Sequence, residues 1–170
     1  MRVGIGVDLH RFAPDRSLVL GGVEVPHRQG LDGHSDADAL THAICDALLG
    51  AVGLGDIGQH FPATDEAFRD ISSLVLLDRV QEMIAEDGWR VENVDAVAVA
   101  EEPKLAPYLD EMKRTLAATL GIDASRVNLK ATRPEGLGSL GRSEGIWAQA
   151  VASLIPKTGA QSAETSSPPR

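Results

Sequence analysis

Apolar and polar positions alternate strictly over the first ten residues of the chain. From residue 3 every second position is apolar, and the positions between carry two glycines followed by a carboxylate and an imidazole. Side chains of a strand point to opposite faces in turn, so this segment predicts a strand with one wholly apolar face. The apolar set is Val3, Ile5, Val7 and Leu9, and the second set is Gly4, Gly6, Asp8 and His10.

The periodicity becomes helical over residues 35–53. Ser35 or Asp36 is a suitable N-cap, and acidic residues follow in the first turn. Apolar residues then recur at helical spacing, which predicts an amphipathic helix with one buried stripe. This stripe consists of Leu40, Ala43, Ile44, Ala47 and Leu48.

A polar line runs along another face of the same predicted helix. Asp38, His42 and Asp46 are spaced by four residues, so their side chains lie above one another. Two interpretations of Asp46 stay open: its carboxylate could orient the His42 imidazole, or it could be a solvated helix residue.

The rest of the chain alternates strand-like and helix-like segments. A Gly21-Gly22 pair between two short apolar runs predicts a tight hairpin. This alternation predicts a sheet with helices packed on one face. Helices are expected at residues 71–87 and from about Pro107 to Gly121, and strands at 91–100, 126–131 and 145–154.

Length and composition indicate one globular domain. The chain has 170 residues, of which 43% are apolar, and its 16 basic and 25 acidic side chains give a net charge of −9. The acidic balance argues against a nucleic-acid or membrane-surface binder. A single cysteine excludes an internal disulfide. We expect a domain over residues 1–157 and a disordered tail over 158–170, which is rich in small and polar residues.

The start of the chain carries no signal-peptide pattern, since no basic segment precedes an apolar run. No stretch approaches the ~18 apolar residues that a membrane helix needs. A cytoplasmic protein is therefore expected. Because Met1 directly precedes the first predicted strand, we expect no fused domain before it.

The candidate metal ligands are Asp8 and His10, which project from one strand face, with His42 of the helix as a third. Two imidazoles and a carboxylate suit zinc, and three protein ligands leave a position open for substrate or water. An isolated Asp-x-His pair is a weak signal by itself. The neighbouring Gly4 and Gly6 strengthen it, because a solvated strand face would normally carry bulkier polar side chains.

Two loops have groups that could bind phosphate. Gly33-His34-Ser35 precedes the predicted helix start, where free N–H groups attract anions, although ordinary capping also explains Ser35. Residues 130–144 leave a strand in a loop that combines glycines, two arginines and Glu135, which could hold a hard divalent cation. An exposed surface loop would have a similar composition. In the turn at 53–58, Asp56 could bind sugar hydroxyls or stabilise the turn.

Several motifs in register resemble the 2-C-methyl-D-erythritol 2,4-cyclodiphosphate synthase family. They are DLHRF, GHSDADALTHAICDALLGAVGLGDIGQHFP, AEEPKLAP and the KAT…EGLG…GRSEGI run, and the resemblance extends from Arg2 to about Pro156. It implies an α+β fold, a two-layer α/β sandwich with a mixed sheet, assembled as a homotrimer whose active sites lie between subunits. It also implies conversion of 4-diphosphocytidyl-2-C-methyl-D-erythritol 2-phosphate to the cyclic diphosphate and CMP.

The resemblance also implies roles for individual residues. Asp8, His10 and His42 match zinc ligands, and Glu135 matches a magnesium (or manganese) contact. His34, Thr132 and Arg133 fall at catalytic positions. The substrate-binding positions are Asp8, His10, His34, Ser35, Asp56, Ile57, Gly58, Phe61, Asp65, Ala100, Pro103, Lys104, Leu105, Thr132, Glu135, Ser139 and Arg142.

The chain departs from the family pattern at several of these positions. Arg133-Pro134 stands within what is commonly a run of threonines, so a charged guanidinium replaces a hydroxyl at residue 133. Ala63 takes the place of a frequent aspartate, and Ser139 that of a common phenylalanine. Together with the non-aromatic Val7, Ser139 alters the expected apolar lining near the trimer axis, toward which Arg142 and Glu144 would face.

The implied reaction needs no general base, because the attacking phosphate is already ionised. Its catalysis rests on positioning and charge neutralisation. Two alternatives remain: a metal-dependent phosphohydrolase with the same ligands, and a non-catalytic trimer that binds an isoprenoid diphosphate.

Overall fold

The computed structural model describes residues 1–157, and the tail expected at 158–170 lies outside the described residues. Five strands form one sheet in the order β4-β1-β7-β5-β6. Neighbouring strands are antiparallel except β5 and β6, which run parallel, so the sheet is mixed as expected. The strands are β1 (Arg2–Ala13), β4 (Gly30–Leu31), β5 (Trp89–Val99), β6 (Val127–Thr132) and β7 (Gly145–Pro156).

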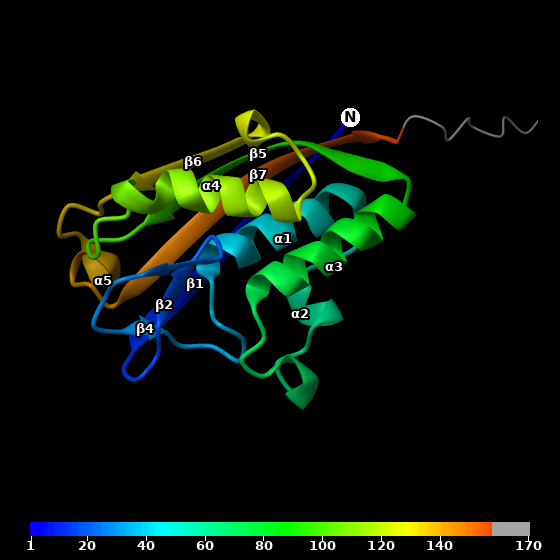
Figure 1. Ribbon diagram of the computed structural model, residues 1–170. Helices are drawn as coiled ribbons and strands as arrows, with labels where there is room; N and C mark the ends of the chain where they lie inside the picture. The colour runs from blue at the N-terminus through cyan, green and yellow to red at the C-terminus, as the bar shows by residue number, and fades with distance from the viewer. Residues whose placement is uncertain (158–170) are drawn as a thin grey trace, which may run out of the picture.

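The three long helices lie on the same face of this sheet, which gives the predicted two layers (Figure 1). They are α1 (Ala39–Val52), α3 (Ser73–Glu86) and α4 (Leu109–Thr119). The short helices are α2 (Ile57–His60) and α5 (Gly138–Gly141), and the glycine pair forms the expected hairpin between β2 (Leu18–Leu20) and β3 (Val23–Val25). Within residues 1–157, none of the helices has the length and apolarity to cross a membrane.

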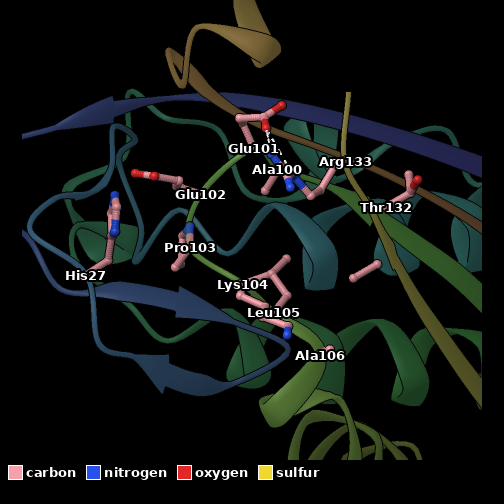
Figure 2. Close-up of a pocket in the computed structure, with 11 residues that line it drawn as sticks. His27, Ala100, Glu101, Glu102, Pro103, Lys104, Leu105, Ala106, Thr132 and Arg133 are labelled. Carbon is pink, nitrogen blue, oxygen red and sulfur yellow. Dashed lines mark hydrogen bonds and ion pairs between the residues drawn. The ribbon is translucent and has the colours of Figure 1, made fainter. Parts of the chain in front are cut away.

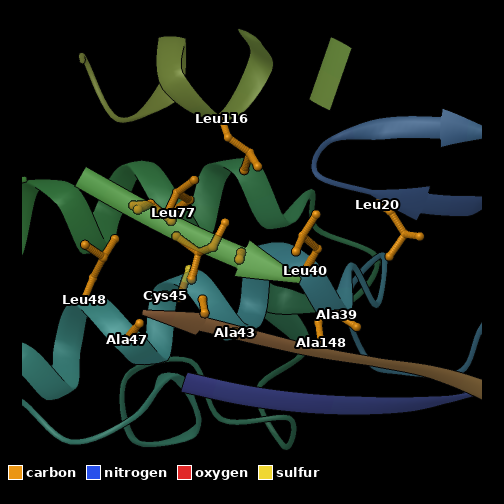
Figure 3. Close-up of a cluster of buried hydrophobic side chains, with 14 of the residues drawn as sticks. Leu20, Ala39, Leu40, Ala43, Cys45, Ala47, Leu48, Leu77, Leu116 and Ala148 are labelled. Atoms are coloured by element: carbon orange, nitrogen blue, oxygen red, sulfur yellow. The ribbon is translucent and has the colours of Figure 1, made fainter. Parts of the chain in front are cut away.

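The main core lies around α1, which is sandwiched between the sheet and α3 (Figure 3). Leu40, Ile44 and Leu48 of the predicted apolar stripe are fully buried. Leu77 of α3 and Leu116 of α4 belong to the same cluster. Burial of such side chains contributes ~1.5–3 kcal/mol each, so this stripe is what holds the two layers together.

The glycine side of β1 faces α1. A Cβ atom on Gly4 would lie 2.0 Å from the Ala47 carbonyl oxygen, and one on Gly6 would lie 2.0 Å from that of Ala43. These are backbone atoms of a helix and cannot move aside. The two glycines therefore let the helix backbone approach the strand closely, and this approach brings α1 beside Asp8 and His10.

The apolar side of β1 faces away from the helices. Val3, Ile5, Val7 and Leu9 are 49–61% exposed in the single chain, and Val151, the partner of Ile5 on β7, is 39% exposed. An apolar patch of this kind on a sheet face commonly marks a protein–protein contact.

The expected start of the first helix was wrong by about three residues. The N-cap is Asp38, not Ser35 or Asp36, and the helix ends at Gly53 in the left-handed conformation as expected. Ala37 has a φ of 58°, and the Ser35 hydroxyl accepts a hydrogen bond from its N–H. This turn separates residues 33–36 from the helix.

The other expected elements are confirmed with small shifts at their ends. The second helix begins at Ser73, because Ser72 caps its first turn. The third begins at Leu109, after a 3₁₀ turn that contains Pro107.

Candidate active site

Asp8, His10 and His42 meet at one end of the β1–α1 contact. Each offers a ligand atom, and these atoms lie within 4.8 Å of one another. The Asp8 Oδ2 atom lies 2.8 Å from His10 Nε2 and 3.1 Å from His42 Nδ1. The two-residue spacing in β1 places Asp8 and His10 on the same face of the strand. The close approach of α1 brings His42 beside them.

The protonation of the His10 ring follows from its hydrogen bonds. His10 Nδ1 lies 2.5 Å from the Asp32 carbonyl oxygen, which can only accept, so Nδ1 carries the hydrogen. In the neutral ring, Nε2 then presents a lone pair toward Asp8. Burial would lower the pKa of His10, but the contact with the Asp8 carboxylate, its negative charge and the influence of Asp32 together outweigh burial and raise that pKa above its ordinary value.

The Asp8 carboxyl is held in its ionised form. Burial alone would raise the pKa of Asp8, but the contacts with the His10 and His42 rings and the positive charge that these rings carry when protonated together outweigh burial and leave that pKa well below its usual range. A carboxylate oxygen and an imidazole lone pair at 2.8 Å repel each other unless a proton or a cation lies between them. The donor set of one oxygen and two nitrogens fits a cation such as zinc.

Neither interpretation of Asp46 was correct. Its Oδ1 atom accepts a hydrogen bond of 2.8 Å from the Ile57 N–H, so Asp46 ties the start of α2 to α1. This contact spans eleven residues across a loop, which helical spacing does not reveal.

A cavity of about 230 Å³ opens beside the three candidate ligands. Most of the site residues predicted in the first half of the chain line this cavity. Phe68 packs edge-on against Phe61 at 5.4 Å and closes one side. The lining residues are Asp8, His10, His34, Ser35, His42, Ile57, Gly58, Phe61, Ala63, Phe68 and Leu76.

Arg16 holds the segment that carries His34 and Ser35. Its guanidinium donates to the carbonyl of Gly33 at 2.8 Å and also to the carbonyl of Ser35. His34 Nε2 in turn lies 2.9 Å from the Asp65 carbonyl. These bonds fix the backbone on both sides of His34 at the edge of the cavity.

Residues 33–35 do not form the phosphate-binding site that was expected at a helix N-terminus. The helix begins at Ala39, and the N–H groups of Asp36, Ala37 and Thr41 already have acceptors. His34 and Ser35 therefore face the cavity from a loop, and their own side chains are the groups available to an anion.

Two predicted carboxylates cap short helical turns. Both oxygens of Asp56 accept from Gln59, at 3.0 Å from its backbone N–H and at 2.9 Å from its side-chain amide. The Asp65 side chain accepts from the Ala67 N–H at 2.9 Å. The turn-stabilising role of Asp56 is confirmed, and its contact with sugar hydroxyls stays a prediction.

A second cavity, of about 660 Å³, lies at the carboxyl ends of the parallel strands β5 and β6 (Figure 2). Glu102 and His27 lie on one side of it, and Thr132 and Arg133 on the other. It shares no lining residue with the first cavity. Its lining consists of His27, Ala100, Glu101, Glu102, Pro103, Lys104, Leu105, Ala106, Ala131, Thr132 and Arg133.

Arg133 is held in an ion pair by Glu101 at the edge of this cavity. Arg133 Nε donates to Glu101 Oε1 at 3.0 Å, and the second carboxylate oxygen accepts from the Gly136 N–H at 3.1 Å. The hydrogen bond with Arg133 lowers the pKa of Glu101. Glu101 thus joins the loop after β5 to the loop after β6.

The remaining predicted residues lie outside both cavities. Glu135 is exposed and has a φ of 54°. Ser139 lines a third hollow, of about 600 Å³, beside Leu9 and Glu144, and Glu144 accepts a hydrogen bond of 2.6 Å from Arg142.

The sequence patterns missed several residues that line the two cavities or bond to the residues that do. Arg16 holds the His34 segment, and His27 and Glu101 line the second cavity. Ser73 lies 2.8 Å from His42 Nε2, although 31 residues separate them in the chain. Of these contacts, only the ion pair of Glu101 with Arg133 could have been found from the sequence, by a search for complementary charges at the ends of the two strands.

The chain is similar to proteins of one kind in three comparisons. The YgbB family model matches residues 1–155. The 2-C-methyl-D-erythritol 2,4-cyclodiphosphate synthase of Alkaliphilus metalliredigens is 58% identical over 159 residues, which cover 94% of this chain and 100% of the relative.

Solved structures agree with the sequence comparisons. One structure of 2C-methyl-D-erythritol-2,4-cyclodiphosphate synthase matches with a TM-score of 0.84 at 36% identity, over 91% of this chain and 100% of that chain. The CDP complex of IspF from Plasmodium falciparum matches with a TM-score of 0.81 at 31% identity, over 92% of this chain and 96% of that chain.

Proposed function

The chain belongs to the YgbB family, the family of the 2-C-methyl-D-erythritol 2,4-cyclodiphosphate synthases, and we propose that its two cavities bind the two ends of one substrate. The resemblance found in the sequence motifs is confirmed. The function is the CMP-releasing cyclisation of 4-diphosphocytidyl-2-C-methyl-D-erythritol 2-phosphate in non-mevalonate isoprenoid biosynthesis. The main structural support for this function is that Asp8, His10 and His42 come together beside His34 and Ser35.

The proposed cation sites follow from the donor atoms. A zinc ion held by Asp8, His10 and His42, and a magnesium or manganese ion at Glu135, would supply Lewis-acid polarisation of phosphoryl oxygens when bound. The mixed nitrogen and oxygen set at the first site favours zinc. A single exposed carboxylate suits a hard cation that takes its other ligands from water and substrate phosphates.

The side chains around the first cavity are proposed to hold the erythritol phosphate. The Ser35 hydroxyl and the His34 imidazole are proposed to contact the attacking 2-phosphate, with the bonds from Arg16 and the contact of His34 with the Asp65 carbonyl keeping them in place. Asp56, Ile57 and Gly58 are proposed to meet the sugar from α2 and its cap. Phe61 and Asp65 belong to the segment that closes over it.

The second cavity is proposed to hold the cytidine end. Ala100, Pro103, Lys104 and Leu105 would enclose the base and ribose, which is supported by a likeness to a structure that is a CDP complex. Thr132 would donate its hydroxyl to the diphosphate. Arg133 would bring a positive charge to the same place, so that positioning and charge neutralisation, rather than proton transfer, lower the barrier.

We propose that both cavities act together only in a homotrimer. In one chain they share no residue, yet the substrate must reach from one to the other. The exposed apolar face of β1 supports an assembly in which neighbouring subunits bring the two cavities together. Ser139 and Arg142 would then line the shared centre, and a single domain over residues 1–157 would act in the cytoplasm.

The products of the reaction test the function. Incubation of the purified protein with zinc, magnesium and 4-diphosphocytidyl-2-C-methyl-D-erythritol 2-phosphate should release CMP in equal amount to a cyclic diphosphate. Phosphorus NMR of the second product, separated from the CMP, should show two coupled phosphorus signals and no terminal phosphate. A terminal phosphate on the product other than CMP would identify the protein as a phosphohydrolase, and retention of unreacted ligand would identify it as a binding protein.

The trimer is tested by an Ile5→Asp variant. Ile5 is 61% exposed in the single chain, so the change leaves the subunit core intact but would bury a charge in the proposed contact. We expect the variant to sediment as a monomer and to lose CMP release at least about tenfold. Val75→Asp is the matched control, since Val75 of α3 is 43% exposed on the helix side. An active, trimeric Ile5→Asp variant would rule out this contact.

A further inference from the structure

A buried chain of hydrogen bonds runs behind His42, on the side away from Asp8. Ser73 Oγ lies 2.8 Å from His42 Nε2 and donates to the Asp36 carboxylate. We propose that Ser73, anchored by Asp36, is a positioning residue that selects the metal-binding tautomer of His42. This inference rests on the proposed cation at Asp8, His10 and His42.

The number of hydrogen atoms available along this series of hydrogen bonds determines which group donates in each bond. Asp36 accepts the Ser73 N–H at 2.9 Å and the Asp38 N–H at 3.2 Å, in addition to the Ser73 hydroxyl. A serine hydroxyl has one hydrogen, and the carboxylate takes it. Ser73 Oγ can therefore only accept from His42, so Nε2 of that ring carries the hydrogen.

The consequence appears at the other ring nitrogen. With the hydrogen on Nε2, His42 Nδ1 presents a lone pair toward the point where Asp8 Oδ2 lies 3.1 Å away. Without Ser73 the opposite tautomer would be favoured, because Nδ1–H could donate directly to the Asp8 carboxylate. That tautomer has no lone pair for a cation on this side.

Burial makes this selection effective. Ser73 is fully buried and His42 is 6% exposed, so water cannot easily replace a missing acceptor. Ser35 Oγ is a second neighbour of His42 Nε2, at 3.2 Å, and it already accepts from the Ala37 N–H. The shorter contact, and the one with a defined hydroxyl direction, is that to Ser73.

The role of Ser73 is separable from its part in the fold. Its backbone N–H already ties the start of α3 to Asp36, and a Ser73→Ala change would leave that bond intact. The change removes only the hydroxyl between Asp36 and His42. Helix α3, which carries none of the three ligands, thereby acts on the metal site through one oxygen atom.

Zinc affinity measured by chelator competition tests the proposal. We expect Ser73→Ala to weaken zinc binding ~10–100-fold, the usual effect of losing a partner of a histidine ligand. Ser73→Thr, which keeps the hydroxyl, should restore most of the affinity. Ser72→Ala is the matched control: Ser72 is the exposed N-cap of the same helix and bonds Leu74, so its loss should leave zinc affinity unchanged.

Nitrogen NMR of the zinc-free protein at mildly alkaline pH reads the tautomer directly. The wild-type His42 ring should carry its hydrogen on Nε2, and Ser73→Ala should shift the population toward Nδ1–H. A wild-type ring protonated on Nδ1 would overturn the proposal even if no variant folded, and so would unchanged zinc affinity in Ser73→Ala. If the wild-type protein binds no zinc at all, the proposed cation site fails instead.

Discussion

Replacing His42 by alanine is expected to remove the bound zinc and to abolish CMP release. His42 supplies one of three candidate ligand atoms, and its ring is almost fully buried, so the alanine variant leaves the site with two of its three candidate ligands. A Lewis-acid metal contributes several kcal/mol to stabilising a developing charge. At 1.36 kcal/mol for each factor of ten, the loss corresponds to roughly a thousandfold in rate.

Metal content by mass spectrometry and CMP release measured on the same sample check this result. His60→Ala serves as the control, because His60 lies nearby on α2 and bonds the Leu54 carbonyl at 2.7 Å but lines no part of the first cavity. It should keep its zinc and its activity. Full turnover by a zinc-free His42→Ala protein would exclude the proposed mechanism.

Replacing Asp38 by alanine is expected to lower the free energy of unfolding by about 3–5 kcal/mol. Asp38 is fully buried at the start of α1. Its Oδ1 atom accepts from the N–H groups of Gly21 and Thr41, at 2.9 and 3.0 Å. Its Oδ2 atom accepts from the Gly22 N–H at 2.7 Å and from the Thr41 hydroxyl at 2.6 Å.

The alanine variant leaves these four donors without their acceptor, and it separates the β2–β3 hairpin from the helix. Asp38→Asn should lose less, since one amide oxygen still accepts two bonds and the Thr41 hydroxyl can turn to accept from the amide. Urea denaturation at fixed protein concentration measures both changes. Asp78→Ala, at an exposed position of α3, is the control and should change stability by less than ~0.5 kcal/mol. An equally small loss in Asp38→Ala would contradict the anchoring role.

The local patterns predicted the elements well because they depend on neighbouring residues. Alternation over residues 3–10 identified β1, and helical spacing identified α1 with its buried stripe. The two candidate ligands of β1 were recognisable because two-residue spacing puts them on one face. His42 was predicted as their partner because it lies on the polar side of the helix that follows.

The site residues that patterns missed are joined by contacts between distant segments. Ser73 meets His42 across 31 residues, and Asp46 meets Ile57 across a loop. Arg16 reaches the carbonyls around His34 from a turn after β1. Such contacts depend on how helices and loops pack, and spacing along the chain carries no information about them.

By itself, the sequence determined that β1 has one apolar and one glycine-bearing face, and that Asp8 and His10 project together from the latter. Only the tertiary structure decided which face is covered within the subunit. The absent Cβ atoms of Gly4 and Gly6 admit the backbone of α1, so the glycine face is buried and the apolar face is left exposed. Alternation establishes which side chains share a face, but the shape of the strand surface selects the helix that packs against it.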